Sequence, residues 1–124
     1  MPFLCPQCNQ SQLNITSKIE LGPDTRSDEI MLQIVQCYKC DFSGIAVYEE
    51  SRRGSLGSDS FSHYCYRVRS ADLRALRELI KNCPDPRNRR CECFSHHTLN
   101  VKDISGRWCA LADVHLDGRF DIER

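Results

Sequence analysis

The sequence has no long hydrophobic run and no excess of charge of either sign. None of its apolar stretches approaches the roughly 18–20 residues that a membrane-spanning helix needs, so we expect no membrane segment. The first residues, Met1-Pro2-Phe3-Leu4-Cys5, lack the basic flank and apolar core of a secretory signal. The chain has 124 residues, and the formal charges of its seventeen basic and seventeen acidic residues cancel. These absences lead us to expect a cytoplasmic protein.

Cysteine is the residue type that the sequence has in excess. The chain contains nine cysteines, and an odd number cannot all pair in intramolecular disulfides. Disulfides are also disfavoured in the reducing cytoplasm. Paired Cys-x-x-Cys units in that compartment are typical of metal ligands. The cysteines therefore favour metal binding over an extracellular disulfide framework.

Two Cys-x-x-Cys pairs predict a first metal site. Cys5-Pro6-Gln7-Cys8 and Cys37-Tyr38-Lys39-Cys40 are separated by 28 residues. Two thiolates three positions apart on a tight turn can bind one ion, and two such turns complete a tetrahedral zinc site. Four protein ligands leave no position for water, so we expect a structural ion. Residues 3–50 resemble a zinc ribbon, and the resemblance implies that Cys5, Cys8, Cys37 and Cys40 are the ligands.

A second group of cysteines and histidines lies further along the chain, within fifteen residues. Three cysteines and one histidine would form a second structural zinc site, and the ligands that we expect are Cys83, Cys91, Cys93 and His96. His97, His63 or Cys65 are alternatives for one of these ligands. Free cysteines are also often buried as small apolar residues, which is the competing interpretation.

Residues 1–50 show the alternation of apolar and polar residues that is typical of strands. The alternating apolar residues are Leu13, Ile15, Ile19, Leu21, Ile30, Leu32, Ile34, Ile45 and Val47. Gly22-Pro23-Asp24 predicts a turn between the first two runs. We expect a three-stranded antiparallel sheet here. The Ser- and Gly-rich residues 51–60 then predict a linker or exposed loop before a second module.

The second module, residues 61–124, is predicted to contain one helix and a β-hairpin. Ser70 is a good N-cap for a helix over residues 71–81, and Pro84 ends it. Asp117-Gly118 predicts a hairpin turn, with strands within residues 108–114 and 119–122. The expected fold class is therefore α+β: a three-stranded zinc ribbon over residues 1–50, followed by a helix, a second zinc centre and a hairpin.

Basic residues are concentrated in residues 67–90, which contain eight basic and three acidic groups. The basic residues are Arg67, Arg69, Arg74, Arg77, Lys81, Arg87, Arg89 and Arg90. Such a cluster can neutralise several phosphates and predicts nucleic-acid binding. The alternative is that the helix charges form an ordinary solvated face. The neutral total, and the seven acidic against three basic groups of residues 1–50, count against nucleic acid.

These patterns favour a protein that binds, not one that catalyses, and we identify no catalytic residues. Nucleic acid is the first predicted partner, through residues 67–90. An adaptor or a subunit of a larger protein complex is the alternative. A zinc-dependent hydrolase or nuclease at the second cluster is a third hypothesis, with Glu92 and Asp103 as the nearest carboxylates. The His-Glu-x-x-His motif of many zinc hydrolases is absent.

Overall fold

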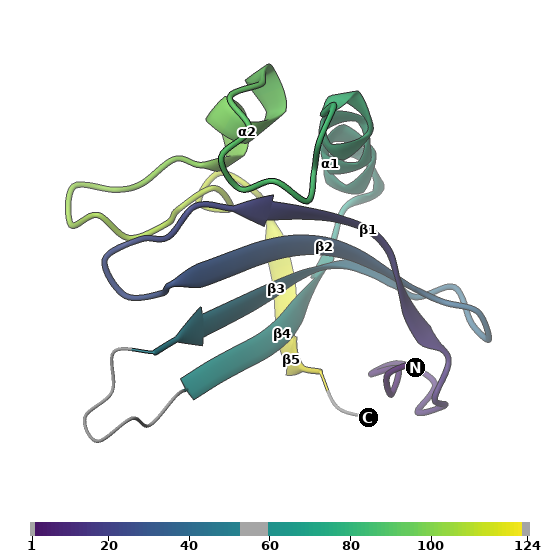
Figure 1. Ribbon diagram of the computed structural model, residues 1–124. Coiled ribbons are helices and arrows are strands. Elements are labelled where there is room, and N and C mark those ends of the chain that lie inside the picture. The colour runs from purple at the N-terminus through teal and green to yellow at the C-terminus, as the bar shows by residue number, and fades with distance from the viewer. Residues whose placement is uncertain (1, 53–59, 123–124) are drawn as a thin grey trace.

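The main element of the protein is an antiparallel sheet of five strands (Figure 1). The computed structural model describes residues 2–52 and 60–122. The strands pair in the order β1-β2-β3-β4-β5. Their bounds are β1 Leu13–Leu21, β2 Glu29–Cys37, β3 Ser43–Ser51, β4 Ser60–Val68 and β5 Leu116–Asp121. The three strands predicted in residues 1–50 are thus confirmed as β1, β2 and β3.

The sheet is larger than the three-stranded ribbon that we expect from residues 1–50, because β4 and β5 extend it. β4 pairs with β3 over its whole length, from Ser51 opposite Ser60 to Gly44 opposite Arg67. An unpaired β3 would expose a row of backbone N–H and C=O groups, and β4 satisfies them. Strands from both predicted modules therefore lie in one sheet. The module boundary at residues 51–60 stays a prediction, since residues 53–59 lie outside the described part of the chain.

Two helices cover one face of the sheet, on the side of β1 (Figure 1). α1, Ser70–Asn82, confirms the predicted helix, although Arg69 occupies the N-cap position and makes no side-chain cap. α2, Phe94–Leu99, is an additional short helix that the sequence analysis did not predict. No helix in the described residues is long and apolar enough to cross a membrane.

The larger hydrophobic core lies between these helices and the sheet. Leu76 and Ile80 of α1 and Leu99 of α2 are buried there. They pack against buried residues of the first three strands, which are Ile19, Leu21, Ile30, Leu32, Ile34, Ile45 and Val47. Each fully buried Leu or Ile side chain stabilises the fold by about 1.5–3 kcal/mol, so this face of the sheet contributes most of the packing energy.

A smaller core lies on the other face, next to the N-terminal segment. Ala46 lies between Ile45 and Val47 in β3, so its side chain points away from the helices. It is buried together with Leu13, Val35, Phe42, Cys65, Cys5 and Cys37. The first cysteine pairs therefore pack against the sheet and cover one end of its second face.

The C-terminal hairpin expected at Asp117-Gly118 is not present. Both residues lie inside the single strand β5, which pairs with β4. Gly118 has a φ of 82° and lies where the pairing with Tyr66 and Arg67 shifts by one residue. A glycine with positive φ suits a β-bulge as well as a hairpin turn, and the edge of β4 was available for pairing. The strand expected within residues 108–114 is mostly turns.

A buried carboxylate connects the β1–β2 turn to the chain beyond α2. The side chain of Asp24 has no solvent exposure and accepts hydrogen bonds from the backbone N–H groups of Arg26, Ser27 and Trp108 at 2.7–2.9 Å. The Arg107 guanidinium donates to the same carboxylate at 2.7 Å. Burial alone would raise the pKa of Asp24, but these donors outweigh it and lower the pKa below 3.8. The group is ionised at neutral pH.

Replacing Asp24 with alanine is expected to lower the free energy of unfolding by about 3 kcal/mol, because three backbone N–H groups lose their acceptor and the partly buried Arg107 guanidinium loses its nearest carboxylate. The lowered pKa means that the contribution is complete at neutral pH and is lost only in strong acid. Urea unfolding at pH 7 measures the change. The exposed Asp113→Ala is the control and should change little. Equal stabilities of the two variants would contradict the assignment.

Candidate metal centres

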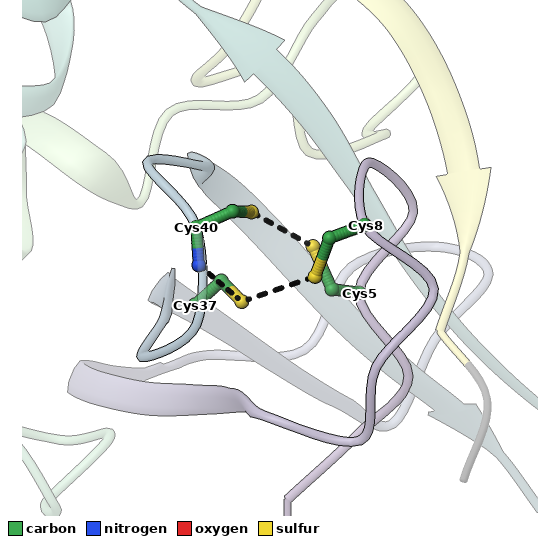
Figure 2. Close-up of side chains that lie close together, drawn as sticks. All are labelled: Cys5, Cys8, Cys37 and Cys40. Atoms are coloured by element: carbon green, nitrogen blue, oxygen red, sulfur yellow. Dashed lines mark hydrogen bonds between the residues drawn. The ribbon is translucent and has the colours of Figure 1, made fainter.

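The first cysteine cluster forms where the start of β1 pairs with the end of β2. Leu13 lies opposite Cys37, so the turn before β1 and the turn after β2 meet at one end of the sheet. The sulfur atoms of Cys5, Cys8, Cys37 and Cys40 all lie within 4.8 Å of one another (Figure 2). The Cys5–Cys40 and Cys8–Cys37 sulfur pairs are each 3.7 Å apart, and no disulfide joins them. This group could hold one metal ion.

Backbone N–H groups point at two of the sulfur atoms of this cluster. Gln7 N–H donates to the Cys5 sulfur at 3.4 Å. Lys39 and Cys40 N–H groups donate to the Cys37 sulfur at 3.3 and 3.4 Å. Burial raises the pKa of the Cys37 thiol, but these donors outweigh burial and lower the pKa to about 7. A backbone hydrogen bond at Phe42 lowers the pKa of Cys40, but burial and the neighbouring sulfur atoms outweigh it and raise the pKa to about 12. Cys37 therefore has the more acidic thiol of this turn, and the thiolate is the form that binds metal.

The second cluster lies between the two helices. Cys83 directly follows α1, Cys91 lies in the connecting loop, Cys93 is the N-cap of α2 and His96 belongs to its first turn. Their ligand atoms also lie within 4.8 Å of one another, so this group could hold a second ion. The His96 Nδ1 atom is 3.2 Å from the Cys83 sulfur and 3.4 Å from the Cys93 sulfur.

The His96 ring is oriented by a backbone carbonyl of the sheet. Its Nε2 atom lies 2.9 Å from the carbonyl oxygen of Glu20 in β1, where Nε2–H can donate a hydrogen bond. That bond leaves Nδ1 facing the three sulfur atoms as a ligand. The His96 side chain is buried, whereas the neighbouring His97 is exposed. The structure therefore selects His96 over His97 for this cluster.

The thiols of the second cluster differ in their acidity. Burial raises the pKa of Cys93, but the backbone N–H of His96, which donates to its sulfur, and the neighbouring Cys83 and Cys91 side chains outweigh burial and lower the pKa to about 6. Burial and the neighbouring sulfur atoms of Cys93 and Cys91 raise the pKa of Cys83 to about 11. Cys93, at the start of α2, therefore has a more acidic thiol than Cys83.

The two other alternative ligands lie away from the second cluster. His63 is on β4, with its Nε2 atom 2.7 Å from the side-chain oxygen of Gln33. Cys65 is fully buried in the smaller core, and burial raises its pKa to about 12. A neutral, buried thiol is an ordinary core residue.

Two of the predicted basic residues contact other side chains of the protein. Arg67 donates to the side-chain oxygen of Gln7 at 2.9 Å, and its guanidinium carbon is 5.1 Å from the centre of the Phe42 ring. It therefore supports the first centre. Arg69 pairs with Asp72 at 3.3 Å at the start of α1. On the same helix, Arg74 and Lys81 are exposed and Arg77 is partly buried, which is also consistent with a solvated face.

Three other basic residues line a cavity of about 450 Å³ at one end of the sheet. These are Arg87, Arg89 and Arg90, from the loop between the helices, and the sequence analysis did not foresee that Arg52 joins them. Arg89 donates to the carbonyl oxygen of Asp28 at 3.1 Å, which fixes its position over the β1–β2 turn. Arg52 reaches this end because it directly follows β3, a tertiary relationship without a local sequence pattern.

Acidic residues share this cavity and offset part of its positive charge. Glu20 and Glu29 line it beside the four arginines. Glu29 pairs with Arg52 at 2.9 Å, and this hydrogen bond lowers the pKa of Glu29. Within residues 2–52 and 60–122, no carboxylate forms an ion pair with Arg87 or Arg90. The cavity therefore keeps positive groups available to an anionic ligand.

No family model, curated protein or solved structure matches this chain. The first cluster is compatible with a zinc-ribbon-like segment on its ligand geometry alone.

Proposed function

We propose that both clusters bind zinc as structural ions. Four cysteines, or three cysteines and one histidine, are the donor sets of structural zinc sites. The compact placement of four ligand atoms in each cluster supports this proposal. Four protein ligands fill a tetrahedral sphere and leave no site for an activated water. This arrangement argues against a hydrolase or nuclease at the second cluster.

We further propose that the protein binds nucleic acid, through arginines that the second centre presents. The observation that carries this proposal is the position of Cys83 and Cys91 at the two ends of the 84–90 loop. An ion bound there would hold both ends of the loop that bears Arg87, Arg89 and Arg90. The backbone N–H of Glu20 in β1 also donates to the carbonyl oxygen of Pro86 at 2.7 Å, which fixes the middle of the loop.

A fixed loop suits phosphate recognition. Guanidinium groups bind phosphate oxygens with two parallel hydrogen bonds. The strength of this contact depends on how the planar set of N–H donors is oriented toward the phosphate. Ordering a flexible loop on binding would cost free energy, and a metal centre that orders it beforehand avoids this cost. The metal therefore has a role in binding although it does not contact the ligand.

Changing Arg87, Arg89 and Arg90 together to serine is expected to weaken nucleic-acid binding at least about 10-fold at low salt. Three lost phosphate contacts should also reduce the slope of log affinity against log salt by about 2–3. Fluorescence anisotropy with labelled oligonucleotides, at a series of salt concentrations, measures both quantities.

The matched control removes the same charge from other exposed positions, as Arg26, Lys39 and Lys102 changed to serine. If both triple variants bind equally well, the loop is not the contact surface. If the unmodified protein binds neither DNA nor RNA at low salt, nucleic acid is not the partner, and the adaptor hypothesis takes its place.

A further inference from the structure

The sheet face opposite the helices carries a groove lined mainly by apolar groups. Its volume is about 520 Å³, and it runs beside the N-terminal segment over β1, β2, β3 and β4. Four rings line it, those of Phe3, Tyr48, Phe61 and His63. Phe61 is the most exposed of them, with 72% of its surface accessible. Rings of this kind on an open sheet are surfaces on which flat ligands can stack.

The four rings support one another through defined contacts. Tyr48 and Phe61 are stacked, with ring centres 6.2 Å apart and planes inclined by 27°. His63 lies edge-on between Tyr48 and Phe3, at 5.6 and 5.3 Å. Its Nε2 atom lies 2.7 Å from the side-chain oxygen of Gln33, also on this face. The floor of the groove is therefore held in place by contacts within the protein, while Phe61 remains accessible to a ligand.

The groove adjoins the arginine-lined cavity. Met31 and Tyr48 line both of them, so the two spaces share a wall. The four arginines thus lie next to the aromatic groove. Positive groups beside accessible rings complement a ligand that has both phosphates and flat bases. An apolar protein segment has no anionic group to pair with the arginines.

We propose that the protein binds nucleic acid as a single strand, with phosphates in the arginine cavity and unpaired bases stacked in the adjoining groove. This inference rests on the proposed nucleic-acid function and adds the form of the ligand and a second contact surface. In a duplex the faces of the bases are covered by their neighbours, so the rings of the groove have access only to unpaired bases.

The test compares two exposed phenylalanines on opposite sides of the molecule. Phe61→Leu keeps an apolar side chain but removes the ring, and Phe94→Leu is the matched control, because Phe94 is 77% exposed on α2. The probes are labelled 12-nucleotide single strands of mixed sequence, one of RNA and one of DNA, and the corresponding 12-base-pair DNA duplex. Phe61→Leu should weaken binding to a single strand about 10-fold, and Phe94→Leu should leave it unchanged.

A tryptophan variant provides a second measurement, which does not depend on a loss of binding affinity. Phe61→Trp should retain the affinity for a single strand, and its fluorescence should be quenched when a base stacks on the indole. Trp108, the only other tryptophan of the chain, is present in the unmodified protein and provides the background. The RNA and DNA single strands show which sugar is preferred.

The outcomes separate this inference from the proposed function. If no probe binds at low salt, the nucleic-acid function and the single-strand inference are both wrong. If the duplex binds as tightly as the single strands and Phe61→Leu has no effect on any probe, the single-strand inference is wrong and the arginine contact stands. If the Phe61→Leu variant binds single strands as tightly as the unmodified protein, stacking is not the contact and an apolar protein partner becomes the better occupant.

Discussion

Replacing Cys37 with serine is expected to remove one metal ion from each chain and to lower the melting temperature by about 15 °C. Structural zinc contributes roughly 10–16 kcal/mol where the metal-free domain is unfolded. We expect loss of the ion to cost about a third of this here, because the larger hydrophobic core does not include the first cluster. At about 4 °C per kcal/mol for a chain of this size, the shift is large and easily measured. Native mass spectrometry counts the ions, and thermal unfolding gives the melting temperature.

The position of Cys37 explains why the effect should extend beyond the metal site. Cys37 is the last residue of β2, and Cys5, from the opposite turn, is buried in the smaller core with Val35 and Ala46. Loss of the ion therefore also loosens one end of the sheet. Cys109→Ser is the control, because this partly buried cysteine belongs to neither cluster. A Cys37→Ser protein that keeps two ions and its melting temperature would contradict the first centre.

Replacing His96 with alanine is expected to remove the second ion and to weaken nucleic-acid binding at least about 10-fold, although no arginine is changed. The reason is that the ion would hold both ends of the arginine loop, and without it the loop must be ordered at a cost when phosphate binds. Native mass spectrometry and anisotropy with the single-stranded probes measure the two effects.

Two neighbouring substitutions show whether the ring acts as a ligand. His97→Ala, at the adjacent exposed position, should keep both ions and full binding. His96→Cys supplies a fourth thiolate, so it should restore the ion and much of the binding. If His96→Ala loses the ion but binds nucleic acid normally, the centre is structural and the loop does not depend on it. Retention of both ions in His96→Ala would refute the ligand assignment itself.

The sequence predicts the candidate metal ligands because their spacing is local. Cys5 and Cys8 lie three positions apart on one turn, as do Cys37 and Cys40, and a turn of that length can place two sulfur atoms on one ion whatever the rest of the chain does. The choice between His96 and His97 is different. It depends on the Glu20 carbonyl oxygen in β1, which no pattern near the histidines contains.

The strands also divide into those that a local pattern predicts and those that the sequence analysis does not identify. β1, β2 and β3 follow from β-branched residues that alternate with polar ones. β4 has alternating side chains too, with Tyr64, Tyr66 and Val68 on the helix side. Its aromatic residues could have indicated a strand.

The sequence by itself determined that this protein has two clusters of metal-ligating residues, a sheet-forming N-terminal half and an amphipathic helix. Each of these depends on residues a few positions apart, where backbone geometry dictates which side chains share a turn or a face. Only the tertiary structure decided that the sheet has five strands and that Arg52 joins the arginines of the 84–90 loop. Those features arise from strand pairing and packing between distant segments, which depend on contacts across the whole fold.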